Sequence, residues 1–241
     1  MAAINKNVVF DCVGTLVGYE KLSEAIDARM GDRLRAEGIK PILFGYTWIE
    51  VAEREYTYLS MSGKYVTFAD TFAALFWRIL FKAGVQEPRR FADEGDLAAI
   101  MEGYKAMELR PGAKECFEKL RNAGFTVWGF TMGDSERVGG YFKNAGVELP
   151  AENLLSCDSS AIGKPDPAAY RPLLERLKSL GGTPWFAAAH LWDASAAKRT
   201  GFRGAYCSVY EGEALTDLFG EMDVLSDSLP EMADKIIAAS R

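Results

Sequence analysis

Histidine is almost absent from this sequence: His190 is the only one among 241 residues. Mechanisms with paired histidines and metal sites built from several histidines are therefore excluded. The four cysteines are far apart and form no CxxC pair. This pattern argues against a structural zinc site and a disulfide framework, and it favours reduced thiols in a cytosolic protein.

Long apolar runs and an excess of basic charge are missing as well. No apolar run is long enough to span a bilayer, and the first seven residues lack the hydrophobic region of a secretory signal. The formal net charge is −6, with both signs mixed along the chain, which argues against nucleic acid or a membrane as partner. We expect a cytoplasmic protein, and the 49% hydrophobic content allows a substantial core.

The stretch Asn7–Leu16 organises the chain. Its apolar run, Val8 to Phe10, is typical of a buried parallel strand and stops at the carboxylate of Asp11. Gly14 permits a sharp turn, and Thr15 adds a hydroxyl. Open α/β sheets bind ligands at the carboxyl ends of their strands, so Asp11 is a candidate nucleophile. The alternative is an Asx turn in which Asp11 only caps the backbone.

Helical periodicity without strand alternation extends from Thr15 to Pro111. The predicted helices are Tyr19–Glu37, Thr47–Met61, Phe68–Ala83 and Asp93–Met107. We interpret residues 17–108 as an inserted helical-bundle cap. The aromatic side chains of the third helix are interpreted as the core of that cap rather than as a cofactor site.

Alternating helices and strands follow Pro111. The predicted elements are helix Ala113–Ala123, strand Thr126–Thr131, helix Ser135–Asn144, strand Leu154–Cys157, helix Asp166–Leu180, strand Trp185–Leu191, helix Ala194–Thr200, strands Gly204–Val209 and Asp223–Leu225, and a helix from Leu229. The pattern predicts an α/β fold: a Rossmann-like, doubly wound parallel sheet formed by residues 1–16 and 109–241.

Polar residues stand at or just beyond the ends of several predicted strands: Asp11, Thr131, Lys164 and Asp193. Because the carboxyl ends of parallel strands share one edge, we expect these side chains to converge. The alternatives are a solvated loop lysine for Lys164 and a helix N-cap for Asp193.

Together these residues resemble the four motifs of the haloacid dehalogenase-like hydrolase superfamily, over nearly the whole chain. The sequence is most similar to the 2-haloacid dehalogenase (type II) group. The matching stretches are Phe10–Leu16, Lys164–Tyr170 and Trp192–Ala194, with Glu55–Leu59 similar to the cap of that group.

The resemblance implies a hydrolase that forms an ester on Asp11 and uses no metal or other cofactor. Asp11 would displace the leaving group, and water would then hydrolyse the ester. Lys164 would keep Asp11 charged, and Asp193 would hold Lys164 and position or deprotonate water. Phosphatases of the superfamily have a second aspartate where this chain has Val13, and no carboxylate follows Asp193 in residues 194–197, so magnesium would find too few ligands.

Substrate-binding roles follow from the same resemblance. The backbone N–H groups after Asp11, together with two threonine side chains, would bind the substrate carboxylate or an oxyanion. The full set of candidate substrate-binding residues is Cys12, Val13, Thr15, Thr131, Met132, Glu50, Arg54, Tyr170 and Trp192. The alternative for Tyr170 is a packed helix residue whose hydroxyl lies at the surface.

Several positions depart from the group. This chain has Val13 where the group has tyrosine, and Glu50 where it has arginine. It has Met132 and His190 where the group has asparagines, and Ala188 where it has serine. Arg54 lies one helical turn beyond Glu50 and would either replace the missing arginine or, as we favour, pair with Glu50. His190 is either a satisfied core residue or a general base beside Asp193.

Three functions remain open on this basis. The first is hydrolytic dehalogenation of a small 2-haloacid. The second is a non-hydrolytic or binding role on a small organic acid or metabolite, and the third is magnesium-dependent phosphate hydrolysis. A homodimer is also expected, because the aromatic-rich cap can expose apolar surface.

Overall fold

The computed structural model describes residues 4–241. They cluster into two compact units. The sheet unit contains the residues up to Val17 and those from Leu109 onward, and the helical unit is Gly18–Glu108. The two strand-like segments that flank the helical unit in sequence meet through a bridge between Val17 and Leu109.

Six parallel strands form the sheet, in the order β3-β2-β1-β4-β5-β6. They are β1 (Asn7–Asp11), β2 (Thr126–Thr131), β3 (Leu154–Ser156), β4 (Trp185–Ala188), β5 (Arg203–Cys207) and β6 (Val224–Ser226). The central strand β1 pairs with β2 and β4, and all of its residues are buried. A strand covered on both faces requires the continuous apolar run that Val8 to Phe10 provide.

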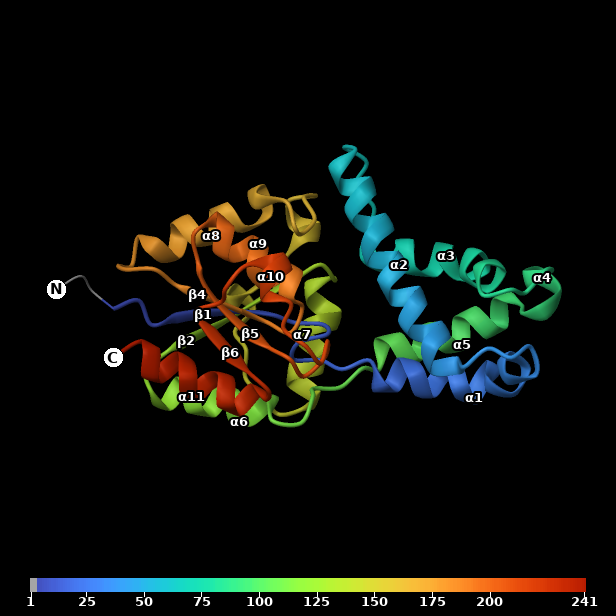
Figure 1. Cartoon of the computed structure of the whole chain (residues 1–241), viewed down its shortest axis with the longest axis horizontal. Coiled ribbons are helices and arrows are strands. Elements are labelled where there is room, and N and C mark those ends of the chain that lie inside the picture. The colour runs from blue at the N-terminus through green and yellow to red at the C-terminus, as the bar shows by residue number, and fades with distance from the viewer. Residues whose placement is uncertain (1–3) are drawn as a thin grey trace. The chain divides into compact units, whose positions relative to one another are not determined.

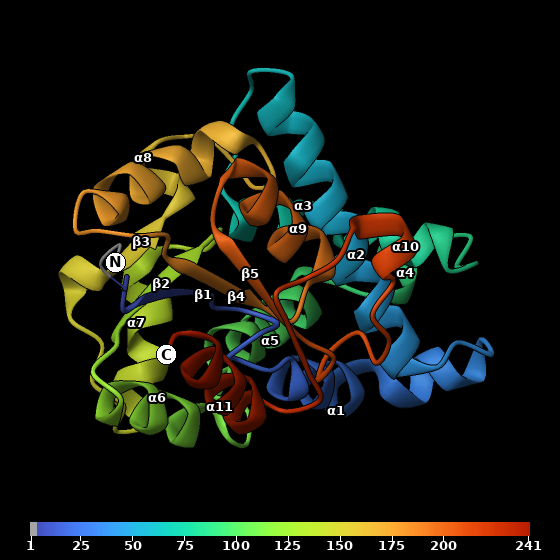
Figure 2. The ribbon, with the colours of Figure 1, turned by 60° about the vertical axis from the view of Figure 1, so that its left-hand side comes forward.

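Helices cover both faces of this sheet. α8 (Pro167–Lys178) and α9 (Leu191–Thr200) lie on one face, and α6 (Ala113–Asn122) and α11 (Leu229–Ala239) lie on the other (Figure 1). Figure 2 shows α6 and α11 side by side, where they contact each other. The remaining elements are α7 (Ser135–Asn144), α10 (Thr216–Phe219) and the 3-10 turns η1 (Ala151–Asn153) and η2 (Cys157–Ser159). This doubly wound arrangement confirms the predicted α/β fold class.

The segment after β4 differs from the prediction. The strand ends at Ala188 rather than Leu191, and α9 begins at Leu191 rather than Ala194. His190 is therefore the N-cap residue of α9 and not a strand residue. The prediction failed here because a short apolar run such as 185–191 has no periodicity that separates strand from helix.

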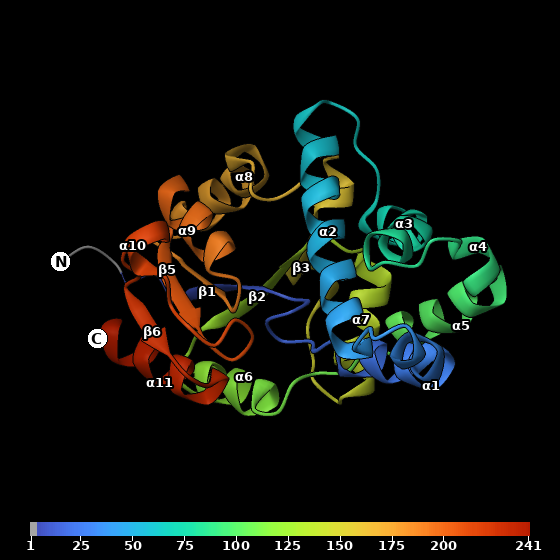
Figure 3. The same ribbon diagram turned by 45° about the vertical axis from the view of Figure 1, so that its right-hand side comes forward.

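The helical unit contains five helices among the described residues. They are α1 (Glu20–Ala36), α2 (Pro41–Met61), α3 (Phe68–Lys82), the short α4 (Pro88–Phe91) and α5 (Glu94–Lys105). Within this unit α1 packs on α2 and α5, and α2 packs on α3 (Figure 3). α2 begins six residues earlier than predicted, because Pro41 occupies its first turn, where a missing N–H costs nothing. None of the helices in residues 4–241 has the length and apolar character needed to cross a bilayer.

Aromatic rings form the core of the helical unit. Trp48 stacks on Phe72 with ring centroids 4.1 Å apart, and its Nε1–H donates to the carbonyl of Phe72 at 2.8 Å. Phe68 and Phe76 are also buried. The prediction that the third helix supplies the core is confirmed for these residues, whereas Phe81 is 58% exposed.

Candidate active site

Asp11 is the last residue of β1, and a tight loop follows it. The amides of Leu16 and Val17 both donate to the carbonyl of Cys12, at 2.8 and 2.9 Å. Gly14 adopts a φ of +89°, and a Cβ at this position would lie 2.1 Å from Cε1 of His190. Glycine is therefore required at position 14 both by the turn and by the adjacent imidazole.

Thr15 fixes one side of the Asp11 carboxylate. Its hydroxyl donates to Oδ2 of Asp11 at 2.7 Å and accepts the N–H of Ala189 at 2.8 Å. Because Ala189 directly follows β4, this hydroxyl joins the ends of two neighbouring strands. Thr15 is fully buried, so both hydrogen bonds are shielded from water.

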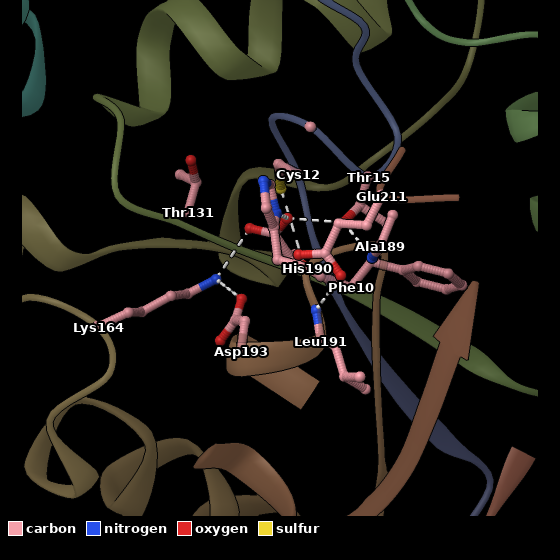
Figure 4. A network of polar contacts seen from close by, with 12 residues as sticks. Phe10, Cys12, Thr15, Thr131, Lys164, Ala189, His190, Leu191, Asp193 and Glu211 are labelled. Carbon is pink, nitrogen blue, oxygen red and sulfur yellow. Dashed lines mark hydrogen bonds and ion pairs between the residues drawn. The ribbon is translucent and has the colours of Figure 1, made fainter. Parts of the chain in front are cut away.

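Lys164 fixes the other side of the carboxylate. Its ammonium donates to Oδ2 of Asp193 at 2.7 Å, as Figure 4 shows. It also donates to Oδ1 of Asp11 and to the carbonyl of Phe130, each at 2.9 Å. The side chain is 0% exposed. A buried ammonium needs acceptors for its three protons, and here two strand ends and one helix supply them. The alternative of a solvated loop lysine is wrong.

Asp193 lies behind Lys164, in the first turn of α9. Its Oδ2 accepts from Lys164, and its Oδ1 accepts from the hydroxyl of Tyr170 at 2.5 Å. Asp193 and Tyr170 are both 0% exposed. The alternatives of an N-cap role for Asp193 and a surface hydroxyl for Tyr170 are therefore wrong, and both residues support Lys164 from the interior.

His190 completes the surroundings of Asp11. Its Nδ1 lies 3.3 Å from Oδ2 of Asp11, and its side chain is 4% exposed. The imidazole contacts the ring of Tyr210 at a centroid distance of 4.9 Å, and its centroid lies 5.7 Å from that of Trp192. The histidine thus adjoins the carboxylate of Asp11, whereas its place in the sequence had pointed to Asp193.

The charges of this cluster change its pKa values. Burial raises the pKa of Asp11, but the charge of Lys164 and the hydrogen bond with His190 outweigh it, and the net pKa lies well below the usual range. Burial lowers the pKa of Lys164, and the two carboxylates more than offset this. Burial and the nearby Asp11 raise the pKa of Asp193. An ionised Asp11 beside a charged lysine is therefore the stable state of the site at neutral pH.

The pKa of the Cys12 thiol changes in the direction opposite to that of Asp11. Burial and the charge of Asp11 raise the pKa of its thiol well above the ordinary value. Its Sγ faces β2, where a Cβ on Gly129 would lie 3.0 Å away. The thiol therefore stays neutral at neutral pH.

The other predicted binding residues of the sheet unit have different surroundings. Thr131 is buried, and its hydroxyl accepts the N–H of Gly133 at 3.0 Å. In Figure 4 no dashed line joins Thr131 to the other side chains drawn. Met132 packs against the apolar core beside β2. Val13 and Trp192 are partly exposed.

Glu50 and Arg54 belong to α2 of the helical unit. The ion pair of Arg54 is with Glu55, at 3.1 Å, and not with Glu50 as we had favoured. The side chain of Arg54 is 44% exposed, so this contact is weak. Neighbouring residues such as Arg54 and Glu55 do not share a helix face. Their side chains meet because the arginine side chain is long and flexible.

Sequence reasoning missed the groups that approach from the loop after β5. Tyr210 contacts the imidazole of His190, and Glu211 accepts the N–H of Leu191 at 3.0 Å. The backbone carbonyl of Phe130 was also missed. The only available signal was position, because Tyr210 and Glu211 directly follow the predicted strand Gly204–Val209.

Metal ligands do not gather at this site. In the part of the chain that the structure describes, no three side chains of His, Cys, Asp or Glu are grouped so that they could hold a metal ion. Both oxygens of Asp193 already accept hydrogen bonds, from Lys164 and Tyr170. The donor set therefore suits a charged carboxylate held by an ammonium.

Comparison with known proteins identifies the fold and the family. The (S)-2-haloacid dehalogenase 2 of Pseudomonas sp. (strain CBS-3) is 26% identical over 239 residues, which cover 98% of this chain and 97% of that protein. The haloacetate dehalogenase H-2 of Moraxella sp. (strain B) is 24% identical over 205 residues, 84% of this chain and 85% of that protein. The L-2-haloacid dehalogenase of Xanthobacter autotrophicus with chloropropionic acid covalently bound has the same fold, with a TM-score of 0.71 at 20% identity, covering 96% of this chain and 98% of that one.

The haloacid dehalogenase-like hydrolase family model matches residues 6–201. This range contains Asp11, Lys164 and Asp193, the three charged groups of the buried cluster. The chain therefore belongs to the haloacid dehalogenase-like hydrolase family.

Proposed function

We propose that this hydrolase displaces the halide from a small 2-haloacid through an ester on Asp11, without a metal ion. The observation that carries the proposal is the buried ion pair of 2.9 Å between Lys164 and Asp11. It keeps the carboxylate ionised, as a nucleophile must be. The full-length similarity to a haloacid dehalogenase supports the choice of substrate class.

In the first step, a carboxylate oxygen of Asp11 attacks C2 of the substrate. The new C–O bond forms as the carbon–halogen bond breaks, and the halide leaves with the bonding electron pair. Reaction at carbon needs no proton transfer, which suits a carboxylate whose hydrogen bonds come from Thr15 and Lys164. The carboxylate oxygen that does not attack becomes the carbonyl oxygen of the ester. The hydrogen-bond donor on that oxygen stays in place and can stabilise an oxyanion.

In the second step, water attacks the carbonyl carbon of the Asp11 ester. We propose His190 as the base for this step, because its ring adjoins the carboxylate, whereas Asp193 is fully buried and accepts from Lys164 and Tyr170. The proton that His190 takes from water passes to the departing alkoxide, which leaves as the 2-hydroxy acid. The second proton of that water stays on the Asp11 carboxyl and then passes through His190 to solvent, which restores the Asp11 carboxylate. Asp193 and Tyr170 take no part in these transfers and act by holding Lys164.

We further propose the helical unit as a cap. Within the resemblance, Glu50 and Arg54 take its substrate-facing positions, while the N–H groups of Cys12 and Val13, with Thr131, Met132 and Trp192, bind the substrate in the sheet unit. The homodimer stays a proposal, supported by exposed apolar side chains on α2, namely Ile42, Leu43 and Tyr46. The cytoplasmic location, expected from four cysteines that are far apart in the sequence and form no CxxC pattern, is also a proposal.

The test is chloride release from (S)-2-chloropropionate by the wild type and by Asp11→Asn, with a chelator present throughout. We expect release by the wild type alone, because an amide cannot replace the anionic nucleophile. In a single turnover in ¹⁸O-labelled water, the label should enter Asp11 and not the first product. Label in the first product would indicate direct attack by water instead.

Other outcomes identify the other functions. A folded wild type that releases no halide from any 2-haloacid would favour a non-hydrolytic or binding role for the same site. Magnesium-dependent release of phosphate from phosphoesters, abolished by the chelator, would contradict the argument from the donor set.

A further inference from the structure

The loop formed by residues 208–215, directly after β5, contacts the His190 turn at two points. The ring of Tyr210 meets the imidazole edge-to-face, with centroids 4.9 Å apart and planes at 63°. The carboxylate of Glu211 accepts the N–H of Leu191 at 3.0 Å. These contacts hold both the ring of His190 and the backbone that follows it.

Glu211 completes the start of α9. His190 is the N-cap residue, and its side chain makes no capping hydrogen bond. The N–H of Leu191 has no partner inside the helix, so it needs an acceptor from elsewhere, and a carboxylate is favoured at this end of a helix. Tyr206, buried on β5, donates its hydroxyl to the same oxygen of Glu211 at 3.0 Å. The acceptor is therefore itself fixed to the sheet.

Arg110 also contacts the ring of Tyr210. The guanidinium carbon lies 5.5 Å from the ring centroid, within the range of a cation–π contact. Nε–H of Arg110 donates to the carbonyl of Gly14 at 3.1 Å, and the amide of Arg110 donates to the carbonyl of Leu16 at 2.7 Å. Because Gly14 also contacts the imidazole, His190 is confined between the nucleophile loop and the ring of Tyr210.

We propose that Tyr210 and Glu211 are positioning residues that keep the imidazole of His190 against Asp11. The inference rests on the proposed role of His190 as the base for ester hydrolysis. The side chain of Ala188, where the resembled group has serine, offers no hydrogen bond to this turn. Support for the imidazole must then come from another segment, and residues 208–215 supply it. Neither residue touches the reacting atoms, so each acts through His190.

The first test reads the contact without any substrate. Since His190 is the only histidine in the chain, its ring protons give NMR signals that need no assignment by mutation. We expect Tyr210→Leu to shift these signals at fixed pH, because the neighbouring ring current is lost. The matched variant Tyr210→Phe keeps the ring and should leave them in place. Signals that do not respond to Tyr210→Leu would overturn the proposal.

The second test is a double-mutant cycle on halide release. Tyr210→Leu should lower kcat by about 10- to 100-fold, as expected for a displaced reacting group, with KM little changed. The same substitution in a His190→Asn background should cause no further loss. An equal loss in both backgrounds would show a general structural effect and refute positioning.

A second pair of variants covers the case in which Tyr210→Leu does not fold. Glu211→Gln keeps an acceptor for the N–H of Leu191, and Glu211→Ala removes it, so only the alanine variant should lower kcat and do so only when His190 is present. If the wild type releases no halide, the proposed function fails, while the NMR signals still decide whether the loop holds His190. If halide is released but no coupling is found, only the positioning role fails.

Discussion

The interiors of the two units differ in what holds them together. At the centre of the sheet unit, the buried ammonium of Lys164 lies within hydrogen-bonding distance of two buried carboxylates, Asp11 and Asp193. The interior of the helical unit is built from aromatic rings, with Trp48 stacked on Phe72. Burying charges costs solvation energy that apolar packing does not incur. Stability alone would favour an apolar interior such as that of the helical unit. The buried charges of the sheet unit therefore indicate a site that is retained for chemistry.

The helical unit also has a buried carboxylate, Asp96, but it is held differently. Asp96 pairs with Arg29 and Arg33, whose side chains are 47% and 41% exposed, and its other oxygen accepts the N–H of Asp93 in a capping box. This carboxylate fixes the start of α5 from the edge of the unit. Removing a charge should therefore have very different effects in the two places.

The largest effect is expected for Lys164→Met. The variant leaves Asp11 and Asp193 buried without a cation, so we expect the free energy of unfolding to fall by about 3–5 kcal/mol and halide release to be lost. Urea unfolding and the chloride assay measure the two effects. As control, Lys119→Met removes surface ion pairs with Glu115 and Asp234 in the same unit and should cost far less, because exposed ion pairs contribute little. Similar losses in the two variants would show that burial of the Lys164 cluster makes no difference to the free energy of unfolding.

An intermediate effect is expected for Phe72→Leu in the helical unit. The change keeps an apolar side chain but removes the stacking on Trp48, and it should lower the free energy of unfolding by about 1–1.5 kcal/mol. The control Phe81→Leu alters an exposed ring and should stay within about 0.5 kcal/mol of the wild type. A loss at Phe72 no greater than that at Phe81 would contradict an aromatic core.

The smallest effect is expected for Asp96→Asn, and it depends on pH. Burial raises the pKa of Asp96, but hydrogen bonds from Arg33, the N–H of Asp93 and Arg29 outweigh it and lower the pKa overall. A carboxylate with a lowered folded pKa stabilises the fold above its unfolded pKa of about 3.9. That contribution is lost as the pH falls through the folded pKa.

The measurement is the difference in unfolding free energy between wild type and Asp96→Asn. It should be about 0.5–1 kcal/mol near neutral pH, because the arginine partners are half-exposed, and should shrink as the pH falls below about 4. Asp32→Asn, at a fully exposed side chain that pairs with Arg35, serves as control and should leave the free energy of unfolding close to that of the wild type. A difference for Asp96→Asn that grows on acidification would refute the assigned pKa direction.

Much of the fold could be predicted because its signals are local. The buried run of β1, the turn at Gly14 and the alternation of strands and helices after Pro111 depend on residues close together in sequence. The position of Lys164 beside Asp11 also followed, since strands of a parallel sheet share one edge. Wrong boundaries occurred where local signals conflict, at Ala188–Leu191 and before Thr47.

The site could be predicted only in part. The sequence indicated Asp11, Lys164 and Asp193, but not that Tyr170 donates to Asp193 from the interior. Nor did it indicate that Arg54 pairs with Glu55. Such details depend on side-chain direction, which residue spacing does not specify.

By itself, the sequence determined the fold class, the buried central strand and the identity of the charged groups at its carboxyl end, because hydrophobic periodicity and turn residues act over a few positions. Only the tertiary structure decided which groups surround His190. Tyr210, Glu211 and Arg110 are distant from His190 in sequence. Tyr210 contacts the imidazole, Glu211 accepts the N–H of Leu191, and Arg110 contacts the ring of Tyr210. The loop with Tyr210 and Glu211 reaches the His190 turn because both follow the carboxyl ends of neighbouring parallel strands, at one edge of the sheet. Contacts of that kind are set by packing in three dimensions, and no local pattern encodes them.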